Sequence, residues 1–219
     1  MSQIFISHSA RDKSYKDWIN QAFASSNVNA KYEEIELLMR GTVTTEDVQN
    51  DIKASSAVFV LLSRNVEQLS HTRDWVAFEV GYAKGVDGGN KDVWVFENFR
   101  DLGHINMALP SFDHYIVYDT IDEIIPYVKS IIESYDDSKV LGNMVKGGSG
   151  GALLAANAAT GFVGGAILGL LYSALSTNRP TGIEVICSNP SCRLKYRVHI
   201  PEPLNQFRCA KCNFWWLKP

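Results

Sequence analysis

The chain has 219 residues, of which 46% are hydrophobic and 21% are charged, and its formal net charge is −3. This composition excludes a disordered chain, because it supplies enough apolar side chains to form a core. The negative net charge argues against a protein that binds nucleic acid through bulk electrostatic attraction.

Short apolar runs alternate with amphipathic stretches in residues 1–137, which we expect to form one domain. They predict strands at Gln3–Ser7, Asn29–Glu33, Ala57–Ser63, Asp92–Phe96 and His114–Tyr118, and helices at Lys13–Ser25, Thr45–Ser55, Thr72–Lys84 and Thr120–Tyr135. The third strand is apolar almost throughout, as is typical of a central strand. Alternating β and α units predict an α/β fold, with a flavodoxin-like five-stranded parallel sheet and helices on both faces. Ligands of such a sheet bind at the carboxyl ends of its strands.

Residues 138–178 have a different composition and predict a Gly/Ala-rich helical segment. No charged side chain occurs between Lys146 and Arg179, and Gly161, Gly165 and Gly169 recur at four-residue spacing. On a helix, this spacing aligns small residues where another helix can pack closely. Residues 147–175 are therefore either a soluble oligomer core or a glycine zipper that contacts a membrane, and the long chargeless run favours the membrane. Without a secretory signal at the N-terminus, we expect a cytoplasmic protein that is membrane-associated if this segment inserts.

Residues 179–219 contain all the cysteines of the chain, in two pairs: Cys187 with Cys192, and Cys209 with Cys212. In a reducing compartment this pattern favours metal ligation over disulfides. Two such pairs complete a tetrahedral four-sulfur site, so we predict a zinc ribbon with a structural Zn²⁺. Four protein ligands leave no open position for catalysis. His199 is expected at an exposed strand position and not as a ligand.

Three elements of residues 1–137 resemble the TIR (Toll/interleukin-1 receptor) domain family. They are the strand and loop Ile4–Asp12, then Gly41 with the runs Val48–Ile52 and Ala57–Ser63, and the Trp-x-x-x-Glu helix Trp75–Ala83. They occur in the order of the family. The resemblance implies that NAD⁺ is the substrate and that Glu79 is the catalytic residue that cleaves its N-glycosidic bond.

The chemistry of a carboxylate at this position agrees with that role. Trp75 and Glu79 are four residues apart and share a helix face. A carboxylate there can bind ribose hydroxyls and stabilise the oxocarbenium-like charge that develops as nicotinamide leaves. The nicotinamide of NAD⁺ is already cationic, so its departure needs no general acid. The alternative is a solvated Glu79 that pairs with Arg73 or Lys84.

Five further residues are candidates for substrate binding. Ser7, His8 and Ser9 end the first strand and could contact ribose or phosphate oxygens. Arg11 could pair with the pyrophosphate, and Trp75 could pack against a ring of the substrate. The chain has no Gly-x-Gly-x-x-Gly or Gly-x-x-x-x-Gly-Lys motif, which gives no support to redox use of NAD or to phosphoryl transfer.

The sequence therefore favours an NAD⁺ nucleosidase that hydrolyses or cyclises NAD⁺ and is activated by self-association into an oligomer or filament. In this family, association typically composes the active site from two protomers, and prokaryotic members imply antiphage defence. The alternatives are a non-catalytic TIR adaptor, which commonly lacks the glutamate, and a membrane-perturbing effector that acts through residues 147–175. Basic and aromatic residues near the cysteines suit a nucleic acid or a protein partner, but a capping module is the simpler interpretation, with no strong nucleic-acid signal.

Overall fold

The computed structural model describes residues 2–32, 40–98, 105, 107–118, 120–136, 182–199, 206–209, 211–212 and 214–217. The described elements of the first part, in chain order, are β1 (Gln3–Ser7), α1 (Lys13–Phe23), β2 (Asn29–Tyr32), α3 (Thr45–Ala54), β3 (Ala57–Leu62), α4 (Arg64–Gln68), α5 (Ser70–Lys84), β4 (Asp92–Asn98), β5 (His114–Tyr118) and α7 (Ile121–Glu133). Four strands follow near the C-terminus: β6 (Ile183–Ile186), β7 (Lys195–His199), β8 (Gln206–Arg208) and β9 (Trp215–Leu217). The predicted helical segment 138–178 lies outside the described residues.

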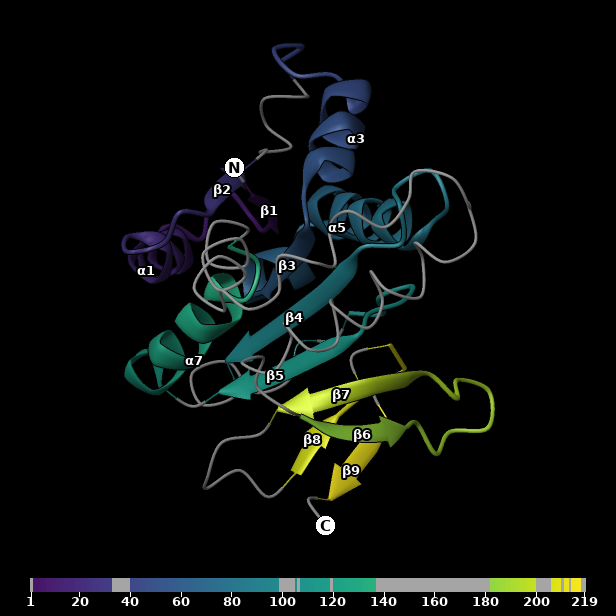
Figure 1. Ribbon diagram of the computed structural model, residues 1–219. Helices are drawn as coiled ribbons and strands as arrows, with labels where there is room; N and C mark the ends of the chain where they lie inside the picture. The colour runs from purple at the N-terminus through teal and green to yellow at the C-terminus, as the bar shows by residue number, and fades with distance from the viewer. Residues whose placement is uncertain are drawn as a thin grey trace, which may run out of the picture.

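The main sheet has seven strands in the order β2-β1-β3-β4-β5-β7-β6 (Figure 1). The first five pair in parallel and follow the doubly wound order 2-1-3-4-5. The predicted α/β fold with a largely parallel sheet is therefore confirmed. β3 is buried along its whole length between β1 and β4, as expected for a central strand.

The prediction of five strands is wrong, because the C-terminal part of the chain extends the sheet. β7 pairs in parallel with β5, with His114 opposite Arg197 and Ile116 opposite His199, and β6 then pairs antiparallel with β7. β8 and β9 form a separate two-stranded sheet. The first C-terminal hairpin is thus part of the α/β core, where the sequence predicted an independent module.

Two apolar layers enclose the sheet. One packs α1 and α7 against one face, around Trp18, Phe59 and Ile131. The other packs α3 and α5 against the opposite face, and it also contains Cys187 and Cys209. Figure 1 shows α1 and α7 at the left of the sheet, and α3 and α5 above and to the right. The cysteine cluster consequently lies within one of the two main layers.

Capping side chains account for the starts of two of the described helices, α3 and α4. Thr44 caps α3 in a capping box with Asp47. Ser63 was expected to end a strand, but it caps the short helix α4, which was not predicted, by accepting a hydrogen bond from Val66 N. Among the described residues, no helix combines the length and the apolar character needed to cross a membrane.

Candidate functional site

Buried polar side chains gather where β1, β3 and β4 end. Parallel strands bring their carboxyl ends to one edge of the sheet, and the order 2-1-3-4-5 puts the reversal of strand order between β1 and β3. Eight residues at the ends of these strands or in contact with them have relative exposures of 7% or less: Ser7, His8, Ser9, Asp12, Ser63, Glu79, Glu97 and Asn98. Burial of so many polar groups is costly unless hydrogen bonds compensate it, so their partners define the site.

Glu79 is held by Ser7. The Ser7 hydroxyl, at the end of β1, donates a hydrogen bond of 2.5 Å to Oε2 of Glu79, which projects from α5. Glu79 is 1% exposed. The alternative of a solvated Glu79 is therefore wrong: Lys84 binds Asp113, at 2.9 Å, and Arg73 lies 3.7 Å from Asp74. A buried carboxylate hydrogen-bonded at the end of a central strand is unusual for a purely structural helix residue.

The other predicted binding residues divide into buried and exposed groups. His8 is buried, and its ring contacts the Tyr32 ring edge to face, with centroids 5.4 Å apart. Ser9 is buried, and its Oγ accepts a weak hydrogen bond from the Arg11 backbone, whereas the Arg11 side chain is exposed. The structure thus brings Ser7 into direct contact with Glu79 and leaves Arg11 at the surface. In the described part of the chain, no contact of the Arg11 side chain bears on its predicted pairing with the pyrophosphate.

Trp75 begins a row of aromatic rings along α5. Its ring stacks on Phe78, with centroids 5.0 Å apart, and Phe78 stacks on Tyr82 at 6.2 Å. The Trp75 indole nitrogen is buried and has no hydrogen-bond partner in the described part of the chain. The same holds for the Thr72 hydroxyl, one turn earlier on the helix. These two polar atoms, at positions 72 and 75, lie close to the helix face that carries Glu79.

Sequence reasoning missed two further buried carboxylates at this edge. Asp12 accepts hydrogen bonds from the Ser63 hydroxyl and, at 2.6 Å, from Asn65 Nδ2, which ties the loop after β1 to the end of β3. Oε1 of Glu97, near the end of β4, accepts a hydrogen bond of 2.5 Å from the Ile105 backbone. A signal was present for Glu97, because it directly follows the predicted apolar strand Asp92–Phe96, and a polar residue at the end of a parallel strand is expected at the ligand-binding edge.

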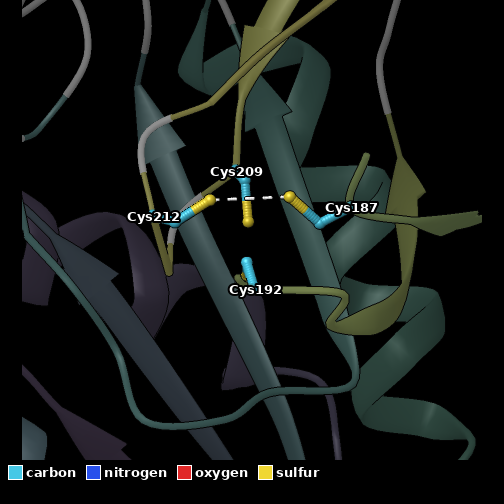
Figure 2. A group of neighbouring side chains, drawn as sticks. All are labelled: Cys187, Cys192, Cys209 and Cys212. Atoms are coloured by element: carbon cyan, nitrogen blue, oxygen red, sulfur yellow. Dashed lines mark hydrogen bonds between the residues drawn. The ribbon is translucent and has the colours of Figure 1, made fainter. Parts of the chain in front are cut away.

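The four predicted metal ligands come together in space. All four Sγ atoms lie within 4.8 Å of one another, and those of Cys187 and Cys212 are 3.5 Å apart. Figure 2 shows the four side chains converging on one point from two separate turns. Tetrahedral Zn–S bonds of about 2.3 Å imply S–S separations of about 3.8 Å, which this cluster can meet. The four cysteines are free thiols and could bind a metal ion, as predicted.

The surroundings of the thiols change how readily each of them ionises. Burial raises the pKa of Cys187 and of Cys209. For Cys212, burial acts in the same direction, but hydrogen bonds from the Phe214 backbone and from neighbouring thiols outweigh it and lower the pKa. Ionising all four thiols together therefore needs a compensating positive charge at the centre, which a divalent metal supplies.

His199 is not at an exposed strand position, and that prediction is wrong. It is 6% exposed, its Nδ1 is hydrogen-bonded to the Tyr127 hydroxyl, and its Nε2 lies 3.4 Å from Nδ1 of His114. Burial, with a smaller effect of the Arg197 charge, lowers its pKa to about 4. The reason is that β7 belongs to the main sheet, where α7 supplies Tyr127 as a neighbour. The group of four cysteines does not include His199.

Comparison with known proteins adds no family assignment: neither the protein-family models nor the curated proteins contain a match to this chain. Membership of the TIR family is therefore a proposal that rests on the residues and geometry of this chain.

Proposed function

We propose that residues 1–137 form a TIR-type domain that cleaves the N-glycosidic bond of NAD⁺, with Glu79 as the catalytic carboxylate. The observation that carries the proposal is the position of Glu79, buried in α5 and bound to Ser7 at the carboxyl end of β1. In a doubly wound sheet, this end of β1 adjoins the point where ligands bind.

The proposed reaction needs one oriented negative charge. As the bond between the ribose C1′ and the nicotinamide nitrogen breaks, its electron pair leaves with nicotinamide, which becomes neutral. The positive charge that develops on the ribose is stabilised by the Glu79 carboxylate, and this attraction is strong in a site that excludes water. A water molecule then adds its oxygen to C1′ and loses a proton, or a nucleophile within the substrate closes a ring. The Ser7 hydrogen bond fixes the carboxylate for this role.

Two buried polar atoms on α5 support a ligand at this site. The Thr72 hydroxyl and the Trp75 indole nitrogen have no hydrogen-bond partner in the described residues, although both are buried. A substrate with hydroxyl and amide groups, such as a nicotinamide riboside, would satisfy them. We propose Trp75 and Thr72 as substrate contacts, with Ser9 and His8 at the neighbouring loop.

The burial of Glu79 supports activation by self-association. A carboxylate that is 1% exposed is not accessible to a dinucleotide, so on this proposal a single protomer is inactive. Contacts between protomers would open and complete the site. As the physiological role, we propose the antiphage NAD⁺ depletion that the TIR resemblance implies.

The test is nicotinamide release by the full-length protein at dilute and at crowded concentration, with assembly followed by light scattering. We compare wild type with Glu79→Gln, which keeps the size and hydrogen-bonding capacity of the side chain but removes its charge. Asp74→Asn is the matched control, because Asp74 is an acid on the same helix with a side chain that is 76% exposed. We expect release by assembled wild type and by Asp74→Asn, and none by Glu79→Gln. Equal silence of all three in assembled samples would refute catalysis and favour the adaptor.

A further inference from the structure

The edge of the five parallel strands is covered by a strand from far along the chain. β7 pairs with β5 over three residues, and the Arg197 backbone donates a hydrogen bond of 2.7 Å to the carbonyl of Asp113, just before β5. Without β7, β5 would be an edge strand with unpaired backbone groups, which is a template for unwanted association. Whatever keeps β7 in place therefore protects the sheet.

The hairpin itself has little apolar area to keep it in place. On β6, Ile183 is 47% exposed and Ile186 is 56% exposed. The burial that β7 does provide comes from Tyr196, Val198 and His199. Tyr196 contacts Phe112 edge to face, with centroids 4.8 Å apart. A two-stranded hairpin is marginally stable by itself, so a further link would help to keep β6 and β7 in place.

The cysteines supply a link at this point. Cys187 directly follows β6, and its backbone donates to the Leu194 carbonyl, just before β7. Cys209 directly follows β8, and its backbone donates to Phe214, just before β9. Both thiols are buried in the layer that also contains Val95 of β4 and Val117 of β5. A metal bound by all four cysteines would join the two hairpins to each other on this face of the main sheet.

We propose that a divalent metal, Zn²⁺ by its four-sulfur ligand set, bound by the four cysteines holds β7 on β5 and so determines whether the edge of the main sheet is covered. The metal would then stabilise the α/β domain itself and not a separate C-terminal module. This inference does not depend on the proposed NAD⁺ chemistry.

The test combines metal analysis with hydrogen exchange of the full-length protein, before and after removal of zinc by a chelator. Cys192→Ser removes one ligand at a partly exposed position, and Ser191→Ala changes its exposed neighbour as the matched control. Hydrogen exchange of β5 is followed in the peptide 107–118, and that of β7 in the peptide 182–199. The central strand β3 is the internal reference for global unfolding.

We expect one zinc ion per chain in wild type and in Ser191→Ala. Chelation and Cys192→Ser should accelerate exchange in β5 and β7 on the order of a hundredfold, with β3 unchanged, because only the clamped edge opens. Three results would each overturn the proposal: no bound zinc, β5 and β7 that stay protected without metal, or equal acceleration in β3.

Discussion

Mild acid should destabilise the protein through His199, which is buried as a neutral imidazole between β7 and α7. Its neighbours are the Tyr127 hydroxyl on α7, His114 on β5 and the charge of Arg197 on its own strand. Among them is no anion to favour the protonated ring. Burial in this place, aided by Arg197, lowers the pKa from its ordinary value of 6.5 to about 4.

The sign and size of the effect follow from proton linkage. Between these two pKa values the unfolded chain binds a proton at His199 that the folded chain does not, so the free energy of unfolding falls as the pH falls. The contribution is fully present above the ordinary value of 6.5 and is lost by about 4. One proton bound only by the unfolded chain changes the free energy of unfolding by about 1.36 kcal/mol per pH unit. Lowering the pH from about 7.5 to about 5.5 should therefore remove roughly 1.4 kcal/mol, because the proton is taken up only below the ordinary pKa.

Urea unfolding of wild type and His199→Phe over this pH range measures the effect. Phenylalanine retains an aromatic ring of similar size but does not titrate. Zinc content is measured at each pH, because protonation of the thiols would otherwise add to the result. His71→Phe is the control, since His71 is exposed. Wild type should lose roughly 1.4 kcal/mol more than His199→Phe. Parallel pH dependences of these two proteins would refute the assignment of a buried neutral His199.

Three further substitutions test individual contacts. Ser7→Ala should lower kcat for nicotinamide release roughly tenfold or more with little change in KM, because Ser7 is fully buried and acts only through Glu79. Steady-state kinetics measure both constants, and a raised KM with unchanged kcat would contradict this role of Ser7. Ser63→Ala should lower the free energy of unfolding by about 1–3 kcal/mol, since it removes both the cap of α4 and a hydrogen-bond donor to buried Asp12. Chemical denaturation measures this loss, and an unchanged denaturation midpoint would contradict it. Lys84→Met should lower the free energy of unfolding by roughly 1 kcal/mol, because it removes the ionic partner of Asp113, which is one-third exposed. This loss should be smaller in high salt. Thermal unfolding at two salt concentrations measures it, and a loss that does not depend on salt would count against an ionic contact.

Much of the α/β part was predictable because its elements are specified locally. β1 and β5 begin and end at the predicted residues, and the Thr44 cap sets the start of α3. In such segments, apolar periodicity and capping side chains lie within a few residues of one another. The short helix α4 was missed, because Ser63 ends one element and starts the next without a break in the chain.

The long-range features could not be predicted from local patterns. Pairing of β7 with β5 joins segments separated by residues 119–194. The alternation of apolar and polar residues around Tyr196 and Val198 indicates a strand but does not indicate which strand it pairs with. The burial of His199 follows from this pairing. The cysteines were predictable because their spacing itself encodes a ligand set. For Glu79, the sequence indicated the residue, whereas its partner Ser7 is known only from the fold.

The most direct test of the central claim is analysis of the products formed from NAD⁺ by the assembled wild-type protein. If Glu79 stabilises the departure of nicotinamide from the ribose, each NAD⁺ consumed should yield one nicotinamide, with the pyrophosphate intact in linear or cyclic ADP-ribose. Formation of nicotinamide mononucleotide and AMP would show cleavage at the pyrophosphate and would contradict the account.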